Sequence, residues 1–327
     1  MATSGSYDYG RTAAQIITAA YENLAVIEAG ATVSSTDSAM ALVRLNHIVK
    51  RHQGPIDGAP GIKVHTRQRV TLILAKGQQT YLIGPASTDA RSSTQVGRTT
   101  IDAAEAIGQT VISVTDTSDT TSYPGTTLTM TGSDFIGIEQ DDGVIFWSTV
   151  SSISAGVSVT IGAGLDVAAG VGNSVYWFTA RAQRFPSIES AVLRDSDHND
   201  TPLEIYTEAR QYDQGVVSKH ADGTPTAILV EPLRINTRVT LNSQPTDVTD
   251  TIVLTVLYPQ EDYDATTDDI ALPQEWLSFI EWELTLALSA PKRVKWTDSM
   301  NMNWTNARNA AMSLNPENSV LYFQTNA

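Results

Sequence analysis

The sequence predicts an α+β protein in which a helical core, made of an N-terminal helix pair and C-terminal helices, carries β-hairpins and an inserted small β-barrel or sandwich. Three observations lead to this fold class. Apolar residues recur at helical spacing near both ends of the 327-residue chain. Between the ends, apolar and polar residues alternate in short runs, as they do in half-buried strands. Residues 99–178 lack Lys and Arg and are rich in Val, Ile, Thr, Ser and Gly, so their composition differs from both flanks.

Two amphipathic helices are expected at the start of the chain. The first covers about residues 10–28, where apolar side chains recur at three- and four-residue spacing: Ala13, Ile16, Ile17, Ala20, Tyr21 and Leu24. Thr36 or Asp37 can cap the second helix. Its apolar stripe consists of Leu42, Leu45, Ile48 and Val49. The Gly54-Pro55 pair then ends it.

The pattern next changes to that of strands. Residues 64–75 alternate, and Lys76-Gly77-Gln78 turns the chain into a second strand at 80–83, which predicts a β-hairpin. Within 99–178, Asp142-Gly143 is a strong signal for a tight hairpin turn. The other short alternating runs of this segment suit a small closed barrel or sandwich. Further strands are expected after it, up to residue 257.

The segment 269–291 is the clearest helix of the chain, and Pro291 ends it. Its apolar side chains fill an arc of about 200°, twice the roughly 100° stripe that covers one core. Trp282 falls outside the arc, and Glu283 falls inside it. Two interpretations stay open. Either this is a central helix of one domain, with Glu283 reaching solvent and Trp282 partly exposed, or a second chain covers it and Trp276, Trp282 and Glu283 belong to the interface.

A last helix, expected to begin at 297–298, precedes an extended tail at 316–327. The tail is apolar, and no partner for it is left in the chain. We predict that Leu321, Tyr322 and Phe323 dock the tail on another protein, because aromatic residues are the usual anchors of a docked segment. The alternative is that the tail folds back as an edge strand on the chain's own β-region.

The composition limits the classes of function. Lys and Arg number 21 against 36 Asp and Glu, which gives a formal net charge of −15. Proteins that grip nucleic acid depend on clustered cations, so such a grip is not expected, although an acidic surface can let DNA slide past. The chain has no cysteine, no apolar run of membrane-spanning length and no start typical of a signal peptide. We therefore expect a soluble protein that is made in the cytoplasm.

No enzyme, cofactor or metal site is predicted. The run from Asp195 to Asp200 alternates oxygen ligands as a calcium loop does at its start, but it lacks the glycine and the closing glutamate of such a loop. A solvated turn is therefore favoured over a calcium site. His47 and His52 lie five residues apart on a helix, cannot share a ligand sphere, and are expected on the surface.

Three segments match one known family in order and spacing. The first is Lys76-Gly-Gln-Gln-Thr-Tyr-Leu-Ile-Gly-Pro85, and the second contains Tyr212, Lys219 and Gly223-Thr-Pro-Thr226. The third is Ile270-Ala-Leu-Pro-Gln-Glu-Trp276, which leads into the helix that ends at Ala290. Together they resemble the head-to-tail adaptor (connector, or tail accessory factor) family of tailed double-stranded DNA bacteriophages. The chain departs from the family pattern at 99–178, which only some relatives carry, and directly after Ala290.

The resemblance implies a structural virion protein of the tail or neck, made in the cytoplasm of a host bacterium. It implies a ring, twelvefold in the family, that lies below the portal protein and joins it to the tail tube or nozzle protein. The ring extends the channel through which DNA passes without sequence-specific binding, and no membrane is involved. In such a ring, Trp276, Trp282 and Glu283 are the expected ring-interface residues, and Leu321, Tyr322 and Phe323 dock on the portal.

The resemblance also implies a division of the chain. Residues 1–98 and 181–327 are expected to form the adaptor core with its β-region. Residues 99–180 are expected to form an inserted β-module, and 316–327 to form the extended C-terminal tail.

Two other functions stay open. The β-rich segment 99–178 suggests a tail-associated module that binds a carbohydrate or a receptor, which exposed aromatic residues and glycan binding would favour. A monomeric acidic hydrolase is the other alternative, and turnover of a cell-wall polymer would favour it.

Overall fold

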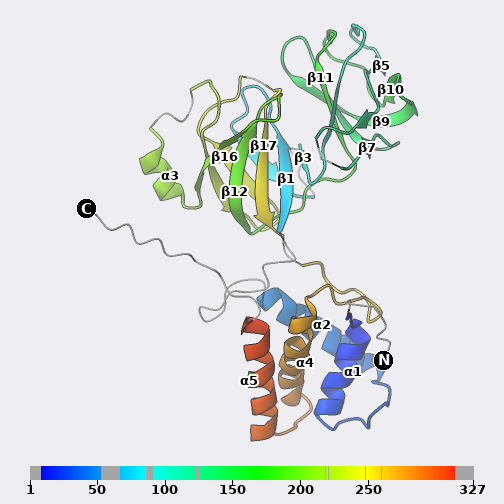
Figure 1. The fold of residues 1–327 in the computed structure, drawn as a ribbon, viewed down its shortest axis with the longest axis vertical. Helices are drawn as coiled ribbons and strands as arrows, with labels where there is room; N and C mark the ends of the chain where they lie inside the picture. Colours follow the sequence, from blue (N-terminus) through cyan, green and yellow to red (C-terminus); the bar gives the residue numbers. More distant parts are fainter. Residues whose placement is uncertain are drawn as a thin grey trace, which may run out of the picture. The chain divides into compact units, whose positions relative to one another are not determined.

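The chain folds into two compact units. The computed structural model describes residues 9–52, 67–85, 91–122, 125–217, 219, 221–246, 248–258 and 260–313. The helical unit combines both ends of the chain, 1–66 and 259–327, whereas the β unit is the continuous segment 67–258. Figure 1 shows four of the helices together in the first unit and the sheets in the second.

The predicted fold class, a helical adaptor core that carries β-hairpins, is wrong. The described residues contain seventeen strands and five helices, and the chain is β-rich with a curled half-barrel sheet. The reason is long-range pairing. β1 (Arg67–Ile73) was expected to form a hairpin with β2 (Thr80–Ile83), but it pairs along its whole length with β17 (Thr251–Leu257), and β2 lies in another sheet. The alternating runs therefore build large sheets, in which the β8–β9 hairpin is one part, rather than hairpins on a helical core.

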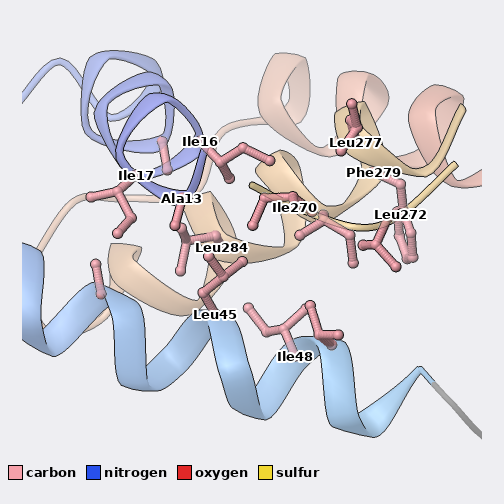
Figure 2. Packing of buried hydrophobic residues seen from close by; sticks show 14 of the residues in the cluster. Ala13, Ile16, Ile17, Leu45, Ile48, Ile270, Leu272, Leu277, Phe279 and Leu284 are labelled. Carbon is pink, nitrogen blue, oxygen red and sulfur yellow. The ribbon is translucent and has the colours of Figure 1, made fainter. Parts of the chain in front are cut away.

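The helical unit is built around α4 (Gln274–Ser289). This helix packs against three others: α1 (Ala13–Asn23), α2 (Ser35–Arg51) and α5 (Asp298–Ser313). Thr12 and Gln15 form a capping box at the start of α1, and Ser34 caps α2 in place of the expected Thr36 or Asp37. Figure 2 shows apolar side chains of α1, α2 and α4 that meet between the helices, among them Ile16, Ile17, Leu45 and Leu284.

Two sheets share the largest core of the β unit. The five-stranded sheet has the order β13-β12-β17-β1-β3, with β3 (Ser92–Ser93), β12 (Ser187–Arg194) and β13 (Asp200–Pro202). The four-stranded sheet has the order β14-β15-β16-β2, with β14 (Glu204–Tyr206), β15 (Ala227–Pro232) and β16 (Thr237–Leu241). α3 (Ala209–Gly215) follows β14 in the chain. The shared core includes Val70, Leu72, Tyr81, Val230, Val239 and Leu254.

Residues 97–178, called the module below, form a third sheet with a core of its own. Its order is β4-β11-β8-β9-β10-β5, with β4 (Gly97–Thr100), β5 (Val111–Ser113), β8 (Phe135–Glu139), β9 (Ile145–Ser154), β10 (Ser158–Ile161) and β11 (Ser174–Phe178). A two-stranded ribbon of β6 (Ser118–Asp119) and β7 (Leu128–Thr129) accompanies it. Gly143 has φ 77° in the turn from β8 to β9, as an Asp-Gly hairpin turn requires.

The module shares buried contacts with the rest of the β unit. Ile145, Tyr176 and Phe178 of the module pack with Ile73 and Val248 of the flanking chain. The Tyr176 hydroxyl also donates a hydrogen bond to the Val248 carbonyl oxygen at 3.0 Å. These contacts fix the module to the strands from which it emerges.

The division of the chain into 1–98 with 181–327, 99–180 and 316–327 stays a prediction. The sequence boundaries between the two compact units fall after residues 66 and 258. The tail at 316–327 lies outside the described residues. Among the helices of the described part, none combines the length and the apolar character needed to cross a bilayer.

Candidate assembly surface

Trp276, the first residue predicted for the ring interface, lies in the interior of the helical unit. Its side chain is 2% exposed, and its ring lies edge-on to that of Phe279 with the centroids 5.8 Å apart. Truncation of a buried Trp to Ala costs roughly 3–5 kcal/mol of stability. Trp276 therefore stabilises the subunit itself, and its role in a ring stays a prediction.

Glu283, the second predicted interface residue, is also buried, at 6% exposure. Trp304 of α5 donates a hydrogen bond from Nε1 to Glu283 Oε1 at 3.0 Å. His52, the residue that follows α2, places its Nε2 3.9 Å from Glu283 Oε2. This separation is too long for a hydrogen bond but allows an ion pair when the imidazole is protonated. The expectations that Glu283 reaches solvent and that His52 lies on the surface are wrong, because both side chains are buried.

The surroundings of Glu283 favour its ionised form. Burial alone would raise the pKa of this carboxyl, but the neighbouring His52, the Trp304 hydrogen bond and the charge of Arg51 together outweigh burial and hold the pKa below its ordinary value. An ionised carboxylate inside a core needs such partners, since a lone buried charge is costly. The group therefore ties α4 to the end of α2 and to α5.

The wide apolar arc of α4 has a cause within one chain. Three helices contact α4, and together they cover more than the roughly 100° stripe that a single neighbour requires. Of the two interpretations of this helix, the central helix of one domain accounts for the arc without a second chain. Among the three predicted interface residues, Trp276 and Glu283 are buried, whereas Trp282 is half-buried and packs against the core of the helical unit.

Trp282 lies beside the loop that joins α4 to α5. Its ring packs edge-on against that of Trp296 with the centroids 6.4 Å apart, and both side chains are half-buried. In the loop, Val294 packs on the core, while Arg293 and Lys295 on either side of it are exposed. We call Trp282, Arg293, Lys295 and Trp296 the α4–α5 corner. It presents two cations beside two indole rings.

The end of α4 is a Schellman motif with an arginine in the position that usually holds glycine. The Arg293 amide donates to the Ala290 carbonyl at 3.1 Å, and the Val294 amide to the Ser289 carbonyl at 2.9 Å. Arg293 has φ 55°, in the left-handed region. A side chain with a Cβ costs roughly 1–2 kcal/mol there. The sequence gives no glycine signal for this turn, so the motif was not predicted.

Sequence reasoning identified Trp282 but not its neighbours. A basic run after α4 was visible, yet nothing in the pattern placed Trp296 against Trp282, because the two come from different segments. The residues predicted to dock on the portal, Leu321, Tyr322 and Phe323, lie outside the described residues.

The run from Asp195 to Asp200 forms a tight turn between β12 and β13. Asp195 Oδ1 accepts hydrogen bonds from the amides of Asp197 and Asn199 at 2.9 and 2.8 Å. Arg194 donates two hydrogen bonds to the Asp200 carboxylate, at 2.7 and 2.8 Å. The carboxylates of Asp195 and Asp200 therefore serve the turn itself. In the part of the chain that the structure describes, no three His, Asp or Glu side chains are grouped to hold a metal ion.

Residues of the first two quoted segments meet around one carbonyl group at the end of β16, although Gln79 stands at a variable position of the first motif. The Leu241 oxygen accepts hydrogen bonds from Gln79 Nε2 at 2.7 Å and from the Tyr212 hydroxyl at 2.9 Å. Gln79 Nε2 also donates to the backbone of Lys219, 140 residues further along the chain. The Lys219 ammonium lies 5.7 Å from the centre of the Tyr212 ring. The first and second quoted segments thus form one group.

In comparisons with known proteins, no family model matches the chain and no curated protein matches it significantly, so the resemblance rests on the quoted residues alone.

Proposed function

We propose that this protein is a structural subunit of a phage virion, a head-to-tail adaptor that forms a ring below the portal and extends the DNA channel towards the tail. The role involves no catalysis and no cofactor. Its partners are the portal protein, the tail tube or nozzle protein and further copies of the chain, and DNA passes through without sequence-specific contacts.

The observation that carries the proposal is the meeting of the first two quoted segments around the Leu241 carbonyl. Gln79 comes from one quoted segment, and Tyr212 and Lys219 come from another. Chance matches scattered along a chain have no reason to contact one another in the fold. Segments that match the family and also contact one another in the fold are better explained by a common origin with the family. This supports the adaptor role for the chain.

The third segment also has a structural task. The Ile270 amide donates to the Arg11 carbonyl at 2.9 Å, and Leu272 and Trp276 enter the core of the helical unit. This segment therefore connects the start of α1 to the start of α4. All three quoted segments hold distant parts of the chain together.

The charge of the chain is compatible with a DNA channel. A net charge of −15 gives a surface that repels phosphate on average. A channel through which DNA moves quickly needs such a surface, because clustered cations on its wall would bind the DNA and slow it.

A carbohydrate- or receptor-binding role of the module has less support. Aromatic rings that serve recognition have to be accessible, since they supply the apolar contact area. The described aromatic rings of the module are buried or half-buried. Arg181 lies 4.5 Å from the centre of the Phe135 ring, and Arg91 lies 6.0 Å from that of Trp147. These rings serve the attachment of the module to the flanking chain.

The test is assembly on the portal. Full-length protein is mixed with the portal protein of the same virus, and the particles are imaged by negative-stain electron microscopy beside each protein alone. We expect an additional ring-shaped layer on one face of the portal, with the rotational symmetry of the portal. Particles that show no added layer at any mixing ratio would overturn the proposal, and specific binding on a glycan array would then favour the carbohydrate-binding alternative.

A further inference from the structure

The α4–α5 corner keeps an arginine where the backbone favours glycine. Arg293 has φ 55°, and its side chain is exposed. Among the described residues, no side-chain hydrogen bond or ion pair holds Arg293, whereas the neighbouring Lys292 binds Asp37 Oδ1 at 2.6 Å. A disfavoured backbone conformation that persists at the surface points to a task for the side chain outside the subunit. Arginine and tryptophan are also the residues that dominate binding energy at protein interfaces.

The module supplies the opposite charge. Residues 99–178 contain no Lys, Arg or His. Their exposed carboxylates are Asp102, Asp116, Asp141, Asp142 and Asp166. Lys76 of the flanking chain donates a hydrogen bond to the Asp142 carbonyl oxygen at 2.9 Å, but the five carboxylates outnumber this cation. A surface with an excess of negative charge, within the same chain as an exposed basic corner, gives two copies a complementary pair of patches.

Most of these carboxylates lie on one edge of the module, where three loops are joined by backbone hydrogen bonds. The amides of Glu105 and Ala169 each donate to the carbonyl of the other, at 2.8 and 3.0 Å. The Gly108 amide donates to Leu165 at 2.8 Å, and the Asp141 amide donates to Ala168 at 2.9 Å. Residues 101–109, 140–144 and 165–173 therefore form one continuous surface, which we call the acidic loop edge.

The acidic loop edge also has an apolar part. Ile107 is 69% exposed, Val171 is 65% exposed and Val144 is 46% exposed. Each comes from a different one of the three joined loops. The same three loops thus carry exposed apolar side chains together with the carboxylates of Asp102, Asp141, Asp142 and Asp166. Protein interfaces combine apolar and polar side chains in this way.

We propose that the α4–α5 corner of one copy binds the acidic loop edge of the neighbouring copy. Trp282 and Trp296 cover the exposed aliphatic side chains, and Arg293 and Lys295 face the carboxylates. Because the two patches differ, the contact is head-to-tail, which is the kind of contact that closes into a ring. This inference rests on the proposed function and names the surface through which its ring forms.

Charge reversal tests the contact. One variant carries Arg293→Glu and Lys295→Glu, and the other carries Asp102→Lys, Asp142→Lys and Asp166→Lys, which leaves Asp141 as the one carboxylate among the four and gives the edge a positive sum. Each patch of a variant then meets a patch of equal sign on its own copies, so self-association of each variant alone should be at least about tenfold weaker than that of the wild type. An equimolar mixture should regain it, because every contact in an alternating arrangement joins opposite charges. Sedimentation velocity of the full-length proteins at low ionic strength measures this.

Two further variants control for folding and for net charge. Arg293→Gly removes the side chain and suits the left-handed backbone, so its melting temperature should equal or exceed that of the wild type while self-association falls. Arg210→Glu combined with Arg234→Glu, two exposed residues of the β unit, lowers the net charge by the same amount as the double corner variant and should leave self-association unchanged. Unchanged association in Arg293→Gly, or a mixture that regains nothing, would overturn the proposal.

Portal binding separates this inference from the proposed function. If the wild type and the mixed variants associate as described but no layer forms on the portal, the adaptor role fails and the contact stands. If the Arg293→Glu, Lys295→Glu variant forms complete rings on the portal, the contact is wrong and the adaptor role stands. DNA is the other partner that a basic corner could bind, and fluorescence anisotropy with labelled duplex DNA tests for it. If DNA binds, if the Arg293→Glu, Lys295→Glu variant loses that binding, and if copies of the protein do not associate, the proposal is wrong. The corner would then be a nucleic-acid site.

Discussion

At Glu283 the helical unit keeps an ionised carboxylate inside its core because Trp304 and His52 face it. The folded-state pKa lies below the ordinary value of 4.5, so this group stabilises the fold above that pH and ceases to do so as pH falls through the depressed pKa. Glu283→Gln keeps an acceptor for Trp304 but loses the charge. We predict that it lowers the free energy of unfolding by about 1–3 kcal/mol at neutral pH.

The pH dependence gives the control for that prediction. Below the depressed pKa the wild-type carboxyl is neutral as well, so the difference between Glu283→Gln and the wild type should shrink there. Urea denaturation at neutral and acid pH measures both values. Glu28→Gln, at an exposed position after α1, should change little at either pH. A difference that is independent of pH would contradict the role of the charge.

Trp282 tests the interface better than Trp276 does. Trp276 is buried, so its truncation would unfold the subunit and hide any effect on assembly. Trp282 is half-buried against Trp296, and we predict that Trp282→Ala reduces ring formation on the portal while it lowers stability by less than about 2 kcal/mol. Electron microscopy with portal and thermal unfolding of the free subunit measure the two effects. Normal rings with a much lower melting temperature would make Trp282 a residue of the subunit core.

At the scale of elements, the sheet of the module depends on a glycine opposite a tryptophan. A Cβ at Gly97 of β4 would lie 2.2 Å from Cε2 of Trp177, the cross-strand partner in β11, whose side chain is 2% exposed. We predict that Gly97→Ala destabilises the β unit by roughly 1–3 kcal/mol, because the buried indole has to move. Gly132→Ala in the same module meets nothing within 4 Å and should stay within about 0.5 kcal/mol of the wild type. Urea unfolding followed by tryptophan fluorescence distinguishes them, and equal effects would contradict the prediction.

Elements could be predicted from sequence where their causes are local. The three- and four-residue spacing around Ile16 and Leu45 identifies helices because both residues of each i, i+4 pair lie within the same short segment of the sequence. Strand pairing is different. β1 pairs with β17, which lies near the other end of the β unit in the sequence. Neither segment alone indicates that Leu72 pairs with Ile252. The share of helix in the fold was therefore overestimated. The hairpin expected between β1 and β2 is wrong, whereas the one predicted at Asp142-Gly143 is present between β8 and β9.

The candidate site shows the same limit. Trp282 stood out because it breaks the apolar pattern of its own helix. The partners of Glu283 come from α2 and α5, so its burial could not be inferred from α4. Arg293 adopts a left-handed backbone conformation although the sequence has no glycine at this turn. Sites made of distant residues or unusual backbone require the structure.

At the scale of the whole molecule, the two units differ in how the chain builds them. The β unit is the continuous segment 67–258 and has its own core, whereas the helical unit needs α1 and α2 from one end of the chain and α4 and α5 from the other. We therefore predict that a fragment of residues 67–258 folds alone, with a β-type circular dichroism spectrum and cooperative thermal unfolding. A fragment of residues 1–66 should not fold, because Ile16, Ile17 and Leu45 lose the face of α4 that buries them.

The control for this prediction is recombination of the missing ends. Addition of a fragment of residues 259–327 to the fragment of residues 1–66 should restore helical circular dichroism, because the two together contain every residue of that core. Glu283→Gln in the added fragment should weaken the recombined unit, since its partners His52 and Trp304 lie one on each fragment. A fragment of residues 67–258 that is unfolded or aggregates, while the full chain unfolds in a single step, would mean that the two units depend on each other for stability.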